Sequence, residues 1–252
     1  MTPADLLLPL AIFLIAALYS AIGQGGASGY LALMAIGGIS TTQMRPAALA
    51  LNILVSATAA WKFSWAGHFS RQIFWPAIIG GAPMAMLGAS IDLPEPAYKT
   101  MVALVLLYAA ARLLQSTRHS QASADFIVNP PPMPVTMAGG LIGLVSGLTG
   151  NGGGIFLSPI MLLAHWSNAR VAAGTAALFT LVNSVAGLAI VSRRIDQFPE
   201  FLWLWMFAAG LGGWLGAEFG LKGLSENAAR KCLAFALALA AVRSLVAMLS
   251  WH

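Results

Sequence analysis

Long apolar stretches follow one another along most of the chain, separated by short polar connections. One transmembrane α-helix needs about 20 apolar residues. Eight stretches approach or reach that length, at residues 6–22, 43–65, 72–91, 97–115, 134–149, 171–192, 200–221 and 228–250. Two more, 26–38 and 153–166, are too short to cross a membrane unaided, and such lengths are typical of re-entrant or half-helices. The pattern predicts an all-α, polytopic membrane protein with about eight transmembrane helices.

The polar, proline-rich stretch from Gln115 to Pro134 lies at the middle of the chain and separates two similar halves. The motif "GQGG" that begins at Gly23 recurs as "GNGG" 127 residues later, at Gly150. The stretch "LPEPAYKTMVALVLLYAAARLL" aligns without a gap on "LSENAARKCLAFALALAAVRSL", 131 residues further on. We therefore expect a first repeat at residues 1–115, a linker at 116–133 and a second repeat at 134–252, each repeat with about four transmembrane helices.

The orientation of the repeats does not follow from the charges. An N-in topology places seven Lys and Arg residues toward the cytoplasm and six outside, which is almost no positive-inside bias. Four crossings in each half would make the repeats parallel, whereas a fifth crossing by the short segment would make them inverted. Both arrangements stay open at the level of the sequence.

Each short apolar segment directly follows a glycine cluster. Glycine costs about 1 kcal/mol per residue inside a helix, so clusters at residues 23–26 and 150–153 predict a break in the helix. Non-helical backbone is tolerated at membrane depth where protein buries it or where it lines a watery cavity. Transporters use such breaks to aim free N–H groups and half-helix N-termini at an anionic substrate. Close helix packing through small residues is the alternative explanation of these glycines.

The composition of the chain limits the charge that a ligand within the membrane can carry. The sequence is 59% hydrophobic and 8% charged, and seven of its eight acidic residues lie at predicted helix ends or in loops, which leaves only Glu218 inside an apolar stretch. A site for a cation would lack carboxylates, so we expect a small anionic substrate. Lys62 and Glu218 read as interfacial residues, although coupling to protons through Glu218 stays open.

The candidate substrate site combines the glycine breaks with the amide and hydroxyl residues that follow them. Arg45 and Arg170 stand near the start of the next long helix in each half, where they would either attract an anion or anchor the helix at the interface. Interhelical hydrogen bonding is the alternative role of the buried amides and hydroxyls. The candidate residues are Gln24, Gly25, Gly26, Arg45, Asn52, Asn151, Gly152, Gly153, Arg170, Thr175 and Asn183.

Other partners are not indicated by the sequence. The four histidines and the single cysteine show no metal-ligand spacing, so we expect neither a metal nor a cofactor. The basic residues are scattered over short loops, which suits contact with anionic lipid headgroups and not with nucleic acid. Nothing in the sequence specifies an oligomeric state.

Two other functions, an intramembrane serine protease and a noncatalytic membrane scaffold, are alternatives to transport. The stretch "GASG", which ends at Gly29, has the Gly-x-Ser-Gly form found in intramembrane serine proteases, with Ser28 as the nucleophile. Such chemistry needs a histidine at matching depth, and the second glycine cluster has no matching serine. The alternative of a noncatalytic membrane scaffold would leave the matched breaks without a purpose.

The motifs "SAIGQGGASGYLAL" and "RPAALALNILVSATAAWKFSWAGHF", followed by "SGLTGNGGGIFLSPIMLL" and "RVAAGTAALFTLVNSVAG", resemble the TauE/SafE membrane permeases, the sulfite exporter or toluenesulfonate-uptake family. The resemblance extends from about Leu6 to Ala247 and implies a transporter of sulfite, organosulfonates or related organic anions in the bacterial inner membrane. The matching positions are Gly23, Gln24, Gly25, Gly26 and Asn52, then Gly150, Asn151, Gly152, Gly153, Gly174, Thr175 and Asn183. From the breaks and this resemblance together we expect alternating access around one central anion site.

Overall fold

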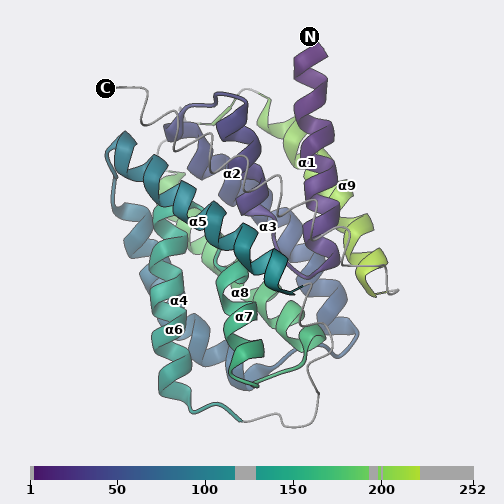
Figure 1. Ribbon diagram of the computed structural model, residues 1–252, viewed down its shortest axis with the longest axis vertical. Helices are drawn as coiled ribbons and strands as arrows, with labels where there is room; N and C mark the ends of the chain where they lie inside the picture. Colours follow the sequence, from purple (N-terminus) through teal and green to yellow (C-terminus); the bar gives the residue numbers. More distant parts are fainter. Residues whose placement is uncertain (1–2, 117–128, 193–197, 200, 222–252) are drawn as a thin grey trace.

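The computed structural model describes residues 3–116, 129–192, 198–199 and 201–221 (Figure 1). This part of the chain forms nine α-helices and no strand. They are α1 (Pro3–Ala21), α2 (Ala27–Ile36), α3 (Thr41–Trp65), α4 (Arg71–Ser90), α5 (Glu95–Ser116), α6 (Pro132–Thr149), α7 (Gly154–Leu163), α8 (Ala169–Val191) and α9 (Leu202–Leu221). The expected helix at 228–250, the second copy of the repeated "LPEPAYK" stretch and most of the linker lie outside the described residues. The all-α prediction is confirmed.

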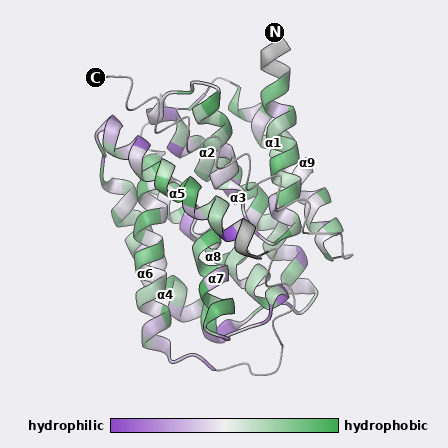
Figure 2. Cartoon of the chain, viewed as in Figure 1, coloured by the Kyte–Doolittle hydropathy of each residue, from purple (hydrophilic) through white to green (hydrophobic). Residues whose placement is uncertain are grey.

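Four of the described helices, α3, α4, α6 and α8, are long and apolar enough to cross a membrane by length and composition. Shorter apolar helices are Leu7–Ala21 within α1, together with α2 and α7. Many large apolar side chains lie on the outside, among them Leu141 at 67% exposure and Trp203 at 67%. Figure 2 shows the helices mostly hydrophobic along their lengths, with hydrophilic residues gathered near the connections. An outer surface of this kind suits contact with lipid and is not that of a soluble domain.

Helices α1, α3 and α9 run in the same direction. Along α1 and α9 the backbone carbonyls of Phe13, Ala17 and Ala21 meet Gly212, Gly216 and Gly220 in order. Along α3 and α9, Val55 lies against Gly213, and Lys62 contacts Glu218 further on. In both pairs the residue numbers rise together, as they do only between parallel helices.

Helices α4, α6 and α8 form a second parallel set. The carbonyls of Ala77, Gly81 and Ala85 on α4 meet Gly139, Gly143 and Gly147 on α6. On α8, Asn183 lies against Gly81 and Gly187 against Ala89, again in rising order. A β-carbon at Gly143 would overlap the carbonyl oxygen of Gly81, so the close approach of α4 and α6 requires a residue without a side chain.

The two sets run in opposite directions, because α3 and α8 are antiparallel. Leu49 lies against Gly187, Asn52 bonds to Ser184, and Phe63 meets Gly174. The sequence repeat equates α1 with α6, α3 with α8 and α4 with α9, and each of these pairs contains one helix from each set. These opposite directions are those of an inverted repeat, so the predicted repeat is inverted if it holds. Each half also exchanges contacts with the other, since α1 packs on α9 and α6 packs on α4.

Candidate functional site

The first glycine cluster interrupts the helix, as predicted. Helix α1 ends at Ala21 and α2 begins at Ala27. Between them Gly23 and Gly26 have φ angles of 70° and 86°, which side-chain-bearing residues rarely adopt. Helix α2 then turns back along α1, as the 2.8 Å hydrogen bond between the hydroxyls of Tyr19 and Ser28 shows. The pair α1 and α2 is a re-entrant hairpin.

The second glycine cluster does the same between α6 and α7. Helix α6 ends at Thr149 and α7 begins at Gly154. Three glycines of the break have positive φ angles: 83° at Gly150, 75° at Gly152 and 90° at Gly153. Because α1 and α6 run in opposite directions, the two hairpins enter the protein from opposite ends of the helix bundle.

Both breaks reach the same two side chains in the middle of the bundle. A β-carbon built on Gly25 would lie 2.9 Å from the Thr180 methyl group and would overlap the side-chain amide of Asn52. One built on Gly152 would lie 2.6 Å from that methyl group and would also overlap the Asn52 amide. The breaks therefore face each other across Asn52 from α3 and Thr180 from α8.

The polar residues around this meeting point form what we call the central cluster, which comprises Gly25, Asn52, Asn151, Gly152, Thr180, Asn183 and Ser184. The four side chains from α3 and α8 are fully buried, with at most 1% exposure. The Asn52 amide nitrogen donates to the backbone carbonyl of Asn151 and to the hydroxyl oxygen of Ser184, each at 3.3 Å. Asn183 lies beside the second break, with its amide nitrogen 3.6 Å from the β-carbon position of Gly153.

Several buried polar atoms of the central cluster make no hydrogen bond within the described residues. Most buried polar groups in proteins have a partner, so a concentration of exceptions calls for an explanation. Donors and acceptors are both represented, and the fold brings them together from both halves. These atoms are Asn52 Oδ1, Asn151 Nδ2, Thr180 Oγ1, Asn183 Nδ2 and Asn183 Oδ1. Such a cluster is suited to hold a small polar ligand.

Other candidate residues lie outside the central cluster. The Arg45 guanidinium donates to the carbonyls of Gly88, Ala89 and Ile91, where α4 ends, so it stabilises a helix C-terminus. Thr175 accepts a 3.0 Å hydrogen bond from the backbone N–H of Ser70 before α4.

The remaining candidates occupy other surroundings. Arg170 is exposed in the first turn of α8. Gly26 lies 2.8 Å, measured from its β-carbon position, from the Tyr30 hydroxyl. The side chain of Gln24 lines a cavity next to the first break and points to a different site from that of Asn52. Packing explains one further glycine of the first motif, since a β-carbon at Gly29 would overlap Ile15.

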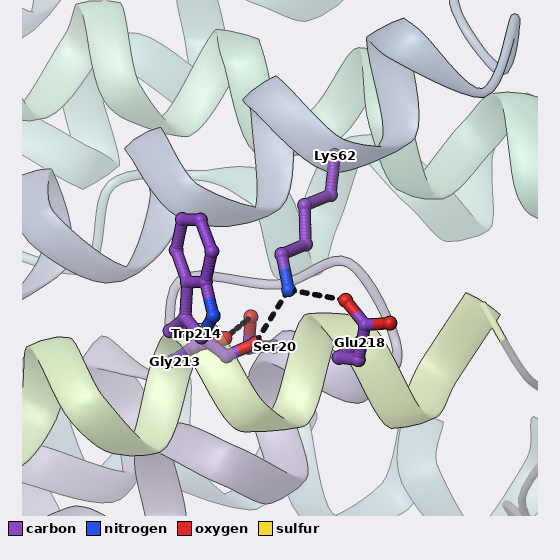
Figure 3. Close-up of polar contacts among 5 residues, drawn as sticks. All are labelled: Ser20, Lys62, Gly213, Trp214 and Glu218. Atoms are coloured by element: carbon purple, nitrogen blue, oxygen red, sulfur yellow. Dashed lines mark hydrogen bonds and ion pairs between the residues drawn. The ribbon is translucent and has the colours of Figure 1, made fainter.

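Sequence reasoning missed Thr180 and the pairing of two charged residues. Thr180 falls four residues before Ser184, so both lie on the same face of α8, and this spacing was a usable signal. Lys62 and Glu218 form an ion pair of 2.7 Å between α3 and α9, and Lys62 also donates to the carbonyl of Trp214 (Figure 3). No local signal links two residues 156 positions apart.

The proposed nucleophile of the protease alternative has no histidine beside it among the described contacts. Ser28 is 1% exposed and shares its hydrogen bond with Tyr19. His68 lies in the connection from α3 to α4, where its ring packs against Phe63. The geometry gives Ser28 a role in holding the α1–α2 hairpin together.

Broken helices that enter the bundle in opposite directions and meet at a buried polar cluster are typical of membrane transporters, and they define the class of this protein. The chain matches the family model described as sulfite exporter TauE/SafE over residues 8–244, and it belongs to that family. No solved structure matches the chain.

Relatives agree with this class. The chain is 38% identical over 239 residues to a protein of Sinorhizobium fredii named probable membrane transporter protein y4hK, covering 94% of this chain and 97% of that protein. It is 31% identical over 85 residues, 33% of each chain, to a probable membrane transporter protein of Xylella fastidiosa. The chain is thus a multi-pass membrane transporter and not an enzyme, and a location in the bacterial inner membrane is consistent with these bacterial relatives.

Proposed function

We propose that the protein transports small sulfur-containing anions, such as sulfite or organosulfonates, or related organic anions, and that it binds them at the central cluster. The observation that carries this proposal is the meeting of both glycine breaks at Asn52 and Thr180, where buried polar atoms lack partners among the described residues. The description of the family as sulfite exporters supports the choice of sulfur oxyanions.

The chemistry of the central cluster favours an anion. Its unmatched donors are the amide nitrogens of Asn151 and Asn183 and the hydroxyl of Thr180, and none of its side chains is a carboxylate. The N-termini of α2 and α7 begin at the two breaks, and each carries the partial positive charge of a helix start. A sulfonate or sulfite group has several oxygen acceptors that such donors would hold, whereas a cation would meet no counter-charge.

Two cavities support transport by alternating access. One, with a volume of about 540 Å³, is lined by Arg45 and Tyr98 and reaches Val191 at the end of α8. The other, of about 80 Å³, is lined by Gln24 and by Ala169 at the start of α8. We call them the Arg45 cavity and the Arg112 cavity, the latter after the arginine that also lines it. The buried central cluster at Thr180 to Ser184 lies between them along α8, as expected of an occluded site with an approach from each side.

Each cavity adjoins one of the breaks. The Tyr98 hydroxyl, in the Arg45 cavity, donates to the carbonyl of Thr149 at the end of α6, 3.2 Å away. Gln24, in the Arg112 cavity, directly precedes Gly25. We infer that a rocking motion of the inverted halves would open one approach while it closes the other.

Uptake by proteoliposomes tests the proposed function. Purified protein would be reconstituted and supplied with labelled sulfite, methanesulfonate, sulfate or acetate, with protein-free vesicles as the control. We expect saturable flux of at least one sulfur oxyanion, inhibited by unlabelled sulfite. Flux of none of these anions above the control, by protein that is folded and reconstituted, would contradict the proposal.

A further inference from the structure

The Arg112 cavity contains polar groups that the central cluster does not use. It lies between the first break, α5, α7 and the first turns of α8. Arg112 from α5 brings a guanidinium group to it, Ser158 from α7 brings a hydroxyl, and Gln24 brings an amide. Three separate elements thus direct polar side chains into one small space.

Two of these side chains have polar atoms that are buried and unmatched. The Ser158 side chain belongs to a residue that is 8% exposed, and its hydroxyl makes no hydrogen bond within the described part of the chain. The same holds for Gln24 Oε1. Leaving such an atom unsatisfied costs about 1–3 kcal/mol, so the structure keeps these groups at a cost in stability.

The size and charge of the cavity indicate its ligand. A single water needs about 10–15 Å³ of cavity volume, so the 80 Å³ of this cavity accommodates a larger group such as a sulfite ion or a sulfonate head. The positive charge of Arg112 selects an anion, and its fork of N–H groups suits a ligand with several oxygens. A half-turn of the Gln24 amide would replace its oxygen by its NH₂ group, and the side chain would then donate as well.

We infer that the Arg112 cavity is a second anion site, distinct from the central cluster, which binds a small oxyanion through Arg112, Ser158 and Gln24. The remaining lining among the described residues, which includes Ile155 and Leu162, is apolar. Because the Arg112 cavity lies next to Gly25, the transported anion would bind there, on one side of the membrane, before it reaches the central cluster. That last role rests on the proposed function, whereas binding of the anion does not.

A negative charge introduced at Ala169, on the exposed edge of the cavity, tests this inference without changing the three polar residues. Ala169 lines the cavity and is exposed, so a longer side chain fits there. Ala169→Glu and Ala169→Gln have nearly the same shape and differ in charge. Calorimetric titration of the purified protein with methanesulfonate should show binding weakened about tenfold in Ala169→Glu and changed less than about twofold in Ala169→Gln. Equal affinity in the two variants would overturn the inference.

Direct variants of the site provide the second arm. Arg112→Gln should weaken methanesulfonate binding about tenfold or more, and Ser158→Ala about threefold, because hydrogen bonds to charged groups are the stronger ones. Arg71→Gln is the matched control, since it also removes a positive charge, from the exposed first residue of α4. Wild-type affinity in both Arg112→Gln and Ser158→Ala would contradict a site at this place.

The source of the anion is tested by the lipid. In nanodiscs of phosphatidylcholine, free methanesulfonate should bind as in detergent, and adding phosphatidylglycerol should not displace it. Displacement by phosphatidylglycerol would show that the cavity holds a lipid phosphate, against the inference. Two variants separate the two proposals. Asn52→Ala should lose flux but keep methanesulfonate binding at the cavity, which would support both sites. Wild-type flux in Arg112→Gln, despite lost binding at the cavity, would show that the cavity is not on the transport path.

Discussion

The side-chain amide of Asn52 donates a 3.3 Å hydrogen bond to the backbone carbonyl of Asn151, so a long helix of the first half is tied directly to the glycine break of the second. The same amide group lies against Gly25 in the break of the first half. Asn52, at the middle of α3, therefore contacts both breaks.

Substitution at Gly152 should be far more harmful than the same substitution at Gly38. Both glycines have positive φ angles, 75° and 72°, so alanine pays about 1–2 kcal/mol of backbone strain at either position. Gly38 has nothing within 4 Å of its β-carbon position, whereas Gly152 would overlap Asn52. We expect Gly38→Ala to keep its flux with a slightly lower unfolding midpoint, and Gly152→Ala to lose its flux. Comparable behaviour of the two variants in thermal unfolding and flux would show that the break is not tightly packed.

Asn183→Leu should separate stability from transport. Both polar atoms of the Asn183 amide are buried without a hydrogen bond in the described part of the chain, so an apolar side chain of similar shape removes an unsatisfied group. We expect the free energy of unfolding to stay unchanged or to rise by about 1–2 kcal/mol, with anion flux lost. A variant that unfolds more easily would show that the amide has partners that stabilise the fold.

Glu218→Gln should destabilise the protein more than Glu95→Gln. Glu218 pairs with Lys62, whose side chain is only 9% exposed, so removal of the carboxylate leaves a mostly buried ammonium group (Figure 3). Glu95 pairs with Lys99 on the surface of α5, where the two side chains are 62% and 37% exposed. We expect a loss of about 1–3 kcal/mol for Glu218→Gln and less than about 0.5 kcal/mol for Glu95→Gln.

Chemical unfolding in detergent measures both losses. Lys62→Met with Glu218→Gln completes a double-mutant cycle, and the double variant should lose less than the sum of the single variants. Additive losses would mean that the two side chains do not interact.

Ser28→Ala should leave transport within about tenfold of wild type, because it removes one hydrogen bond worth about 0.5–1.5 kcal/mol, that to Tyr19. Tyr19→Phe removes the same bond from the other side and should have a similar effect on the unfolding midpoint. Cleavage of a transmembrane reporter peptide by wild type, abolished in Ser28→Ala, would contradict the role assigned to this serine.

Much of the fold was readable from local patterns. Apolar lengths placed the helices within a few residues, and the recurrence of "GQGG" as "GNGG" located both breaks, because glycine is a local determinant of backbone conformation. The relative direction of the two halves was not readable, since the number of membrane crossings in each half was open at the level of the sequence. The contacts between α3 and α8 supplied it.

The candidate site was only partly predictable for a similar reason. Asn52 and Gly152 come together because two inverted hairpins meet, and the sequence shows the hairpins but not their meeting. Arg45 and Thr175 carry polar groups at suitable positions along the chain, yet tertiary contacts direct both to the ends of α4. The spacing of residues along a helix predicts which side of the helix each residue lies on, but it does not predict which other helix packs against that side.

The measurement that tests the central claim most directly is sulfite flux in proteoliposomes by wild type, Asn52→Ala and Arg71→Gln, at equal amounts of folded protein. If the breaks form the transport site at Asn52, wild type and Arg71→Gln will carry sulfite at similar rates, and Asn52→Ala will be slower by about tenfold or more, since it removes donors to both the break and Ser184. Flux through Asn52→Ala at the wild-type rate would contradict the account.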